Sequence, residues 1–408
     1  GAGAKTGAGP RLAASEHENG ATGEASAPVL DISPFFSMRS GNGYSKLANV
    51  ALPILGSIQV GGGRFNASIT PVSLSSGTIT QDYAQHFSGG NVAGAALKAG
   101  YDWRWLKADI GTTPLGFATT NIVGGLQFFL PLTDNLHFNF GFERRNITDS
   151  VVAYSGIKDK ETGQKWGGVM KNHAQMQLAY DVDGFNLYAG TGYSYLDGKN
   201  TRTNEEYEAS LGGSAVVYKD DMQEVRLGTD MMWFRFDNNQ YVLPDSSANC
   251  NMVLLASITQ DTSSVCNVLR QNQALLRQQY TALVGTDTGY DEFSRTLFNG
   301  QVDSYGYGGY FSPQSFFSIS VPVSYRGQVD KWMWDTGARL GYQTYHSRAV
   351  AGLNAISQSG LIGGAHANVF YQVTPMLRFG ANLEYQKAGP WNQFIAGVSA
   401  HYTFLNSK

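Results

Sequence analysis

Residues 394–404 alternate between apolar side chains and small or polar ones, which restricts this segment to a β-strand with two different faces. One face carries Phe394, Val398, Tyr402 and Phe404, and the other carries glycine, serine, histidine and threonine. Strands of about ten residues with aromatic ends and a polar alternate face are typical of outer-membrane β-barrels. The pattern recurs along most of the chain, so we expect an all-β, transmembrane antiparallel barrel of the Gram-negative outer-membrane type.

The composition agrees with a barrel and excludes other classes. The chain has 49 Gly, 22 Tyr and 22 Phe, only 15% charged residues and a formal net charge of -3. It contains no run of about eighteen apolar residues, so it has no transmembrane helix. The near-neutral charge gives no reason to expect nucleic acid as a partner.

Turn residues divide the chain into about sixteen strands, an even number, with short turns alternating with longer loops. Both ends of such a barrel lie on the periplasmic side, and the long loops face outward. A barrel of this size encloses an aqueous lumen rather than a core filled by side chains.

The expected organisation has four parts. Residues 1–28 are rich in Gly, Ala, Ser, Thr and Glu and are interpreted as a flexible linker. The barrel spans 29–404, with an extracellular loop insertion at 241–300, and 405–408 form a tail. No signal peptide is visible at Gly1, and we expect the chain to be a piece of a longer protein.

The insertion interrupts the strand pattern and carries both cysteines. Cys250 and Cys266 are expected to form a disulfide, because an outer-membrane protein folds through the oxidising periplasm. Residues 268–284 place leucines at helical spacing before Gly285 and predict a short helix. We expect this helix to cover the mouth of the barrel as a lid; packing on the outer rim is the alternative.

The strand alternation also predicts which charged side chains face the lumen. Candidate residues of a substrate path are Glu143, Arg145, Arg226, Asp230, Arg339, Arg378 and Glu384. The same register turns inward Lys98, Asp102, Lys107, Asp109, Lys171, His173 and Asp335. Both signs of charge are present without an obvious bias, which favours a neutral hydrophilic solute over one ion type.

An enzymatic barrel is the alternative class. His137, His173, His366 and His401 lie on scattered strands, and none belongs to a recognisable nucleophile motif. The pair Asp220-Asp221 is interpreted as part of a turn. We therefore expect no enzyme activity, no metal site and no cofactor.

Several stretches resemble one family in their order along the chain. They include Gly62-Gly63-Arg64, Ala108 to Gly116, Trp166-Gly167-Gly168-Val169, and the segment Tyr305 to Gln314 followed by Ser318 to Tyr325. Together they resemble the C-terminal barrel of the cellulose synthase operon protein C family, the outer-membrane cellulose exporters. The insertion of about sixty residues at 241–300 departs from the family pattern as judged from these motifs.

The resemblance implies an outer-membrane export pore that passes a nascent β-1,4-glucan, cellulose, from the periplasm to the exterior. Its partners would be the polysaccharide in transit, outer-membrane lipid and lipopolysaccharide. Periplasmic tetratricopeptide repeats upstream would connect it to the inner-membrane synthase. An exporter of a poly-N-acetylglucosamine or alginate type polymer, or a general or sugar porin, is the alternative.

The family-like segment holds the aromatic candidates Tyr305, Tyr307, Tyr310 and Phe311. One interpretation places these rings near the pore mouth, where they stack on sugar rings. The other gives them a structural role, as an aromatic girdle beside a bend that glycine permits.

Overall fold

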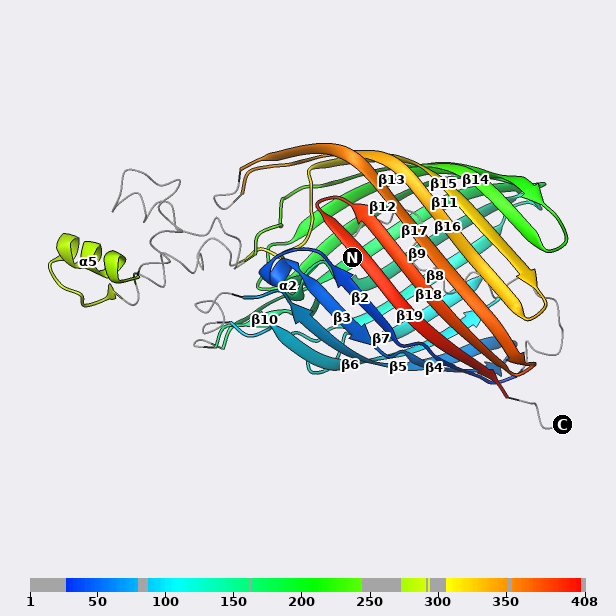
Figure 1. Ribbon diagram of the computed structural model, residues 1–408, viewed down its shortest axis with the longest axis horizontal. Coiled ribbons are helices and arrows are strands. Elements are labelled where there is room, and N and C mark those ends of the chain that lie inside the picture. The colour runs from blue at the N-terminus through cyan, green and yellow to red at the C-terminus, as the bar shows by residue number, and fades with distance from the viewer. Residues whose placement is uncertain are drawn as a thin grey trace.

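The computed structural model describes residues 27–79, 87–160, 163–243, 273–290, 293, 306–350 and 354–404. Within these residues the strands form one antiparallel sheet that closes on itself as a barrel (Figure 1). Nineteen strands are named, but β1 with β2 and β3 with β4 each make one strand of the wall. The two-residue β10 pairs only with the end of β11, so the wall has the expected sixteen strands.

The strands are β1 (Val29–Ile32), β2 (Phe35–Arg39), β3 (Leu47–Ala51), β4 (Ile54–Val60), β5 (Gly63–Ser76), β6 (Asn91–Trp103), β7 (Leu106–Thr112), β8 (Ile122–Pro131), β9 (Leu136–Asn146), β10 (Ile157–Lys158), β11 (Lys165–Val182), β12 (Phe185–Lys199), β13 (Asn204–Lys219), β14 (Gln223–Phe236), β15 (Ser315–Val329), β16 (Trp332–Ser347), β17 (Ile356–Thr374), β18 (Leu377–Ala388) and β19 (Trp391–Thr403). The helical elements are η1 (Gly43–Ser45), α2 (Val151–Ser155) and α5 (Gln273–Val284).

The first and last strands close the wall. β1 and β2 both pair with β19, and the blue and red strands lie side by side in Figure 1. At the end of this seam the Phe404 backbone N–H donates to the Pro28 carbonyl oxygen at 2.9 Å. Both ends of the described barrel therefore lie at the same end of the molecule.

Proline interrupts the first two wall strands. The break between β1 and β2 falls at Ser33 and Pro34, and the break between β3 and β4 falls at Leu52 and Pro53. Proline cannot donate a ladder hydrogen bond, so the pairing stops at these positions. The Ser33 backbone N–H instead donates to the Pro53 carbonyl at 3.0 Å, which keeps the two strands together.

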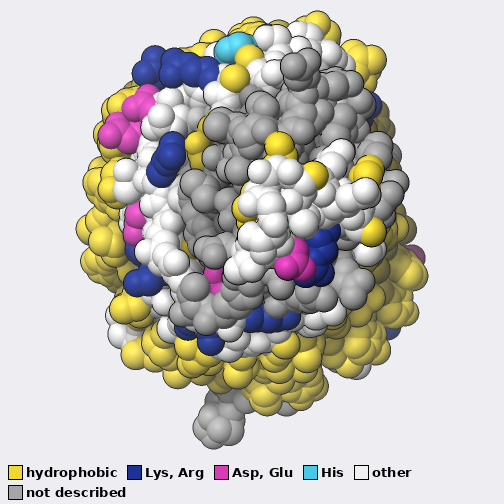
Figure 2. Space-filling view, turned by 90° about the vertical axis from the view of Figure 1, so that its left-hand side faces the viewer, with side chains coloured by type: hydrophobic (Ala, Val, Ile, Leu, Met, Phe, Trp, Pro, Cys, Tyr) yellow, Lys and Arg dark blue, Asp and Glu magenta, His cyan; other side chains and the backbone are white. Residues whose placement is uncertain are grey.

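The outer face of the wall is apolar, as the alternation predicts. Phe142, Leu340, Leu361 and Leu383 lie on this face and are 54% to 66% exposed. Seen from one end, hydrophobic side chains form a belt around the circumference, while charged side chains of both signs lie on the end face (Figure 2). Exposed apolar area of this extent needs lipid as its solvent.

One end of the barrel has only tight turns. At the β11–β12 hairpin Asp183 has φ 39° and Gly184 has φ 80°, the left-handed conformations that a two-residue hairpin turn requires. The other end carries the long connections, at 77–90, 147–164 and 237–314. We refer to these as the short-turn end and the loop end.

The insertion helix is present but lies apart from the barrel. α5 begins at Gln273, and residues 268–272 of the predicted helix lie outside the described residues. Tyr280 contacts the rings of Tyr290 and Phe293 at 5.8 and 4.7 Å, so part of its apolar stripe packs on its own segment. Figure 1 places α5 beyond the loop end and away from the strands, not across the mouth as the lid hypothesis expected.

Other predictions fall on residues that are not described. Cys250, Cys266, Tyr305, most of the 1–28 linker and the tail at 405–408 lie outside the described residues, so the disulfide stays a prediction. Among the described residues, no helix combines the length and apolar character needed to span a membrane.

Candidate functional site: the lumen and its mouth

The strand register places the predicted polar residues on one continuous inner face. Lys171 is opposite Arg145, His173 is opposite Glu143, and Arg226 is opposite Ser324. The same alternation continues around the wall and places Arg339, Glu384 and Arg378 on this inner face. The lumen is therefore lined by charged and hydroxyl side chains from both halves of the chain.

Arg145 and Glu143 belong to one ion-pair network on β9. The Arg145 guanidinium donates two hydrogen bonds to Asp109 of β7, at 2.6 and 2.8 Å. Its Nε also lies 3.5 Å from a Glu143 oxygen, and the Lys98 ammonium lies 3.6 Å from Asp109. The bidentate geometry holds the arginine against the wall.

Two further networks pair charges elsewhere on the wall. Lys171 contacts Glu206 and Glu208, and His173 Nε2 lies 3.4 Å from Glu208. Near the short-turn end, Glu224 accepts from Arg226 at 2.5 Å and from Arg326 at 2.8 Å. The Lys171 network has more carboxylates than cations, and the Glu224 network has more cations than carboxylates. The wall therefore offers many hydrogen-bonding groups without favouring one sign of ion.

The sequence analysis missed the partner of Asp230. The hydroxyl of Tyr188 on β12 donates to the Asp230 carboxylate on β14 at 2.8 Å, across the intervening strand β13. Gly212 lies between them, in register with both residues. The tyrosine–glycine–aspartate alignment across three strands becomes visible only when the register is known.

The other predicted path residues have separate neighbours. The Arg339 guanidinium lies 3.4 Å from the Gln386 amide oxygen, and Gln386 in turn donates to Glu384. The Arg378 guanidinium lies 5.3 Å from the ring centre of Phe370. The structure thus distributes these residues along the wall instead of gathering them into one centre.

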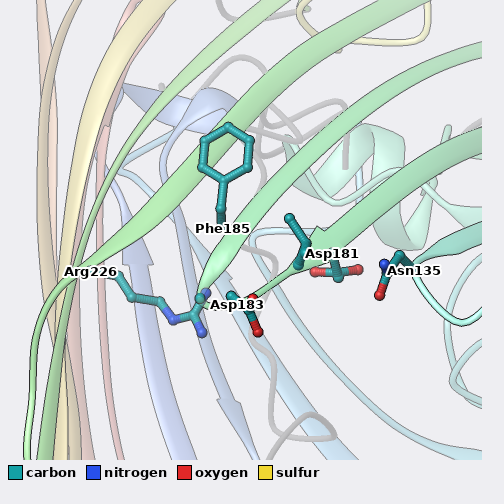
Figure 3. A pocket seen from close by; sticks show the side chains of 7 residues that line it. Asn135, Asp181, Asp183, Phe185 and Arg226 are labelled. Carbon is teal, nitrogen blue, oxygen red and sulfur yellow. The ribbon is translucent and has the colours of Figure 1, made fainter.

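A pocket opens at the short-turn end. It is lined by Asn135, Asp181, Asp183, Phe185 and Arg226. Figure 3 shows the two acidic side chains between Arg226 and Asn135. Asp181 accepts a hydrogen bond from Asn186 at 2.7 Å, so this rim of the lumen is polar.

A packed cluster of buried side chains, which we call the mouth core, lies at the loop end. It consists of α2 with Tyr310, Phe311 and the lumen-facing rings Phe234, Phe316, Tyr345 and Trp391. Val151, Val152 and Ala153 of α2 are fully buried and belong to two adjoining clusters, whose other members come from strands on many sides of the barrel. Hydrophobic packing of this extent occupies the inside of the barrel at the loop end.

Phe311 is the central ring of the mouth core. Its centroid lies 5.0 Å from Trp391, 5.1 Å from Tyr345 and 6.4 Å from Phe316, in edge-to-face arrangements. Tyr310 is 1% exposed, and its hydroxyl lies 3.2 Å from the Asn204 amide nitrogen, which donates to it. Tyr307 is also buried, and it lies under Arg202 with 4.6 Å between the guanidinium and the ring centre.

A buried ion pair holds the mouth core to the wall. Arg39 on β2 donates to Asp149 at 2.7 Å, and the Phe311 backbone N–H donates to the second carboxylate oxygen at 3.0 Å. The Arg39 guanidinium also lies 3.8 Å from the Trp391 ring centre. One carboxylate therefore connects the first wall strand, the segment before α2 and the family-like motif.

Polar groups in the core are satisfied by neighbouring backbone. The Ser150 hydroxyl accepts from the Ala153 N–H at the start of α2 and donates to the Gly309 carbonyl at 2.7 Å. Burial by itself would raise the pKa of Asp149, but the Arg39 charge and the two hydrogen bonds hold this pKa below its usual value. Burial also raises the pKa of Tyr310, so its hydroxyl stays neutral.

In the described part of the chain, no group of three His, Cys, Asp or Glu side chains is arranged to hold a metal ion. His366 and His401 are instead paired with single carboxylates, Asp335 at 3.4 Å and Asp31 at 2.6 Å.

Known proteins resemble this chain in sequence and in fold. A protein named cellulose synthase 2 operon protein C, from Komagataeibacter xylinus, is 30% identical over 414 residues, which cover 92% of this chain and 27% of that protein. Cellulose synthase operon protein C of Pseudomonas fluorescens (strain SBW25) is 28% identical over 322 residues, covering 75% and 20% of the two chains. The chain thus spans less than a third of the length of these relatives.

A solved structure named bacterial polysaccharide outer membrane secretin matches with a TM-score of 0.54 and 12% identity, and covers 93% of this chain and 98% of that one. This likeness concerns the fold alone. Together with the apolar belt it identifies a barrel of the Gram-negative outer membrane.

The model of a protein family described as cellulose synthase operon protein C C-terminus matches residues 45–243 and 267–405. The matched residues include most wall strands, the Arg145 network and the motif of the mouth core. The chain belongs to the cellulose synthase operon protein C C-terminus family.

Proposed function

We propose that this barrel is an export pore that passes a nascent polysaccharide, cellulose, from the periplasm to the cell exterior. The observation that carries the proposal is the lumen: sixteen strands enclose an inner wall of locally paired charges and hydroxyls. A barrel of this size leaves an aqueous channel. A wall that hydrogen-bonds a neutral polymer without holding one ion type suits continuous passage.

The direction follows from the ends of the barrel. Short turns face the periplasm in bacterial barrels, so the pocket lined by Asp181 and Arg226 would lie at the entrance. The mouth core would then lie at the exit. For a glucan to leave, α2 and the segment around Phe311 must move away from the lumen.

The chain performs no chemistry in this proposal. The polymer is made at the inner membrane, and its synthesis drives the transport. The partners are the β-1,4-glucan in transit, outer-membrane lipid and lipopolysaccharide. In the full-length protein, periplasmic tetratricopeptide repeats would precede the barrel and connect it to the synthase.

A general porin is the second candidate, and the mouth core argues against it. Val151 and Val152 are fully buried in the core at the loop end, whereas a general porin needs an open path for small solutes. An exporter of another exopolysaccharide would use the same wall, so the polymer must be identified by experiment.

The test is deletion of the gene in its own host, followed by complementation with the full-length gene. We expect the deletion strain to lose extracellular cellulose, measured as the glucose that purified cellulase releases from washed cells. Cellulose outside the deletion strain at the normal level would contradict the proposal. If the deletion strain loses a different extracellular polysaccharide, the barrel exports that polymer instead of cellulose.

Two measurements on the purified barrel test whether it is a general porin or an enzyme. In a planar bilayer we expect conductance well below that of an open sixteen-stranded porin, and a large steady conductance would favour the porin. Incubation with cellopentaose should leave the oligosaccharide intact, whereas release of glucose or cellobiose would indicate an enzyme.

A further inference from the structure

Two aromatic side chains lie against the lumen wall where a glycine of the next strand leaves room for them. A methyl group added at Gly212 would lie 2.6 Å from the Tyr188 hydroxyl oxygen and 2.7 Å from its ring. A methyl group at Gly380 would lie 2.7 Å from the Phe370 ring. Any side chain at these two positions would push the ring away from the wall.

The register places both rings inside the barrel. Tyr188 is opposite Gly212, on the face that carries Asp230, and Phe370 is opposite Gly380, on the face that carries Arg378. Both rings are half-buried, unlike the fully enclosed rings of the mouth core. Ring atoms of each side chain cover the glycine, and the part of each ring that stays exposed lies on the lumen side of the wall.

Each ring has a charged side chain beside it. The Tyr188 hydroxyl donates to Asp230, which keeps further lone pairs that can accept from a ligand hydroxyl. Beside Phe370, the Arg378 guanidinium lies 5.3 Å from the ring centre and has several N–H donors. One site therefore combines a ring with an acceptor, and the other combines a ring with a donor.

This combination matches the chemistry of a β-1,4-linked glucan. Its pyranose rings carry all hydroxyls equatorially, so the two flat faces of the chain are made of C–H groups and the edges are made of hydroxyls. The face of an aromatic ring is electron-rich and attracts C–H groups, whereas charged side chains at its edge hydrogen-bond hydroxyls. The geometry points to Tyr188 with Asp230, and Phe370 with Arg378, as two stacking sites for glucose units in the lumen, an inference that rests on the proposed export function.

The rings could instead serve only to cover glycine. On the lipid face Trp334 covers Gly327 in the same way, with 2.5 Å to an added methyl group, and no glucan can reach it. A purely structural role predicts an effect on stability alone. A stacking role predicts in addition that the C–H face of a bound glucan touches these rings.

The experiment is saturation-transfer NMR with cellohexaose and the 408-residue barrel in an amine-oxide detergent, which has no sugar headgroup to compete. Protein aromatic signals are irradiated and the transfer to each ring proton of cellohexaose is measured. We expect the axial C–H protons to receive most of the saturation. Maltohexaose, whose α-1,4 linkages curve the chain, should receive much less.

The variants are Tyr188→Leu and Phe370→Leu, in which leucine still covers the glycine. Each should weaken cellohexaose binding roughly threefold to tenfold, and together they should abolish the axial C–H pattern. Tyr188→Phe keeps the ring and should retain the pattern. Phe379→Leu, on the lipid face of the same sheet, is the matched control and should change nothing.

Unchanged binding and transfer in the double variant, or no cellohexaose binding by the wild-type barrel, would overturn the stacking sites. If wild-type cells export cellulose while the barrel lacks the stacking pattern, only this inference fails. If the deletion strain exports cellulose normally, the proposed function fails instead.

Discussion

Arg39 and Asp149 form a buried ion pair at 2.7 Å, although 110 residues separate them in the chain. The side chains are 8% and 1% exposed, and the carboxylate also accepts from the Phe311 backbone N–H. The pair therefore connects a wall strand to both segments of the mouth core. Removing one partner leaves the other charge buried and uncompensated.

The Asp149→Ala variant tests this pair. We expect the mouth core to lose about 3–5 kcal/mol, because Arg39 keeps its charge in a desolvated site. Planar-bilayer recordings should show more frequent and larger openings than the wild type. Asp220→Ala, in an exposed turn at the other end, should leave the recordings unchanged. The double variant Arg39→Met/Asp149→Leu should recover most of the closure, and a closed Asp149→Ala channel would contradict the role of the pair.

Closure of the channel by the mouth core should depend on pH only under acidic conditions. The pKa of Asp149 in the folded protein is held below its usual value. The ion pair therefore contributes its full stabilisation at any pH above the pKa of an unfolded aspartate, about 3.9. This stabilisation is lost as the pH falls through the lower pKa that Asp149 has in the folded protein. Conductance should stay constant from about pH 8 to pH 5 and rise below about pH 4. Asp149→Asn should already be open at neutral pH, and an opening transition near neutral pH in the wild type would contradict this prediction.

The seam between the first and last strands should depend on Asp31 and His401. The His401 Nδ1 lies 2.6 Å from an Asp31 oxygen, across the β1–β19 pairing. His401→Ala should destabilise the barrel by about 1–3 kcal/mol. The measurement is the temperature at which unboiled protein shifts to the unfolded position on a denaturing gel. The control is His366→Ala, because the His366–Asp335 contact is longer, at 3.4 Å, and lies between consecutive strands. This variant should lower the unfolding temperature less.

Gly168 should not tolerate a side chain. Its φ is +59°, and an added methyl group would lie 1.7 Å from the Thr119 hydroxyl oxygen. Gly168→Ala should cost about 1–3 kcal/mol or more through strain and crowding below α2. Gly56→Ala is the control, since no atom lies within 4 Å of the added methyl group. The same gel assay applies, and equal shifts for the two variants would count against the steric argument.

The wall could be predicted from the sequence because its period is local. Phe379, Leu383 and Tyr385 alternate with Arg378, Asn382 and Glu384, and the structure turns the two sets to opposite faces. A strand face depends only on neighbouring residues and on a two-residue repeat. The number of strands and the two-residue hairpin at Asp183-Gly184 follow from the same local signals.

The mouth core could not be predicted in this way. Phe311 and Asp149 are 162 residues apart, and nothing near either residue indicates the other. Aromatic residues beside glycines are compatible with a lipid girdle, a sugar contact or a packed core, and only the register with Phe316 and Tyr345 distinguishes these possibilities. The helix at 273–284 had a clear local pattern, but its position relative to the barrel depends on contacts that the pattern does not contain.

The seam has a consequence for how the barrel folds. Asp31 and His401 are separated by 370 residues, so the pairing of β1 with β19 closes a loop that contains nearly the whole barrel. Loops of this length are slow to close, because much chain entropy is lost before any contact forms. The hairpins of neighbouring strands can form earlier, and the curved sheet then has two open edges that are able to pair with other chains. We therefore expect closure to be the last step of assembly, with these edges protected until then by the cell's folding machinery.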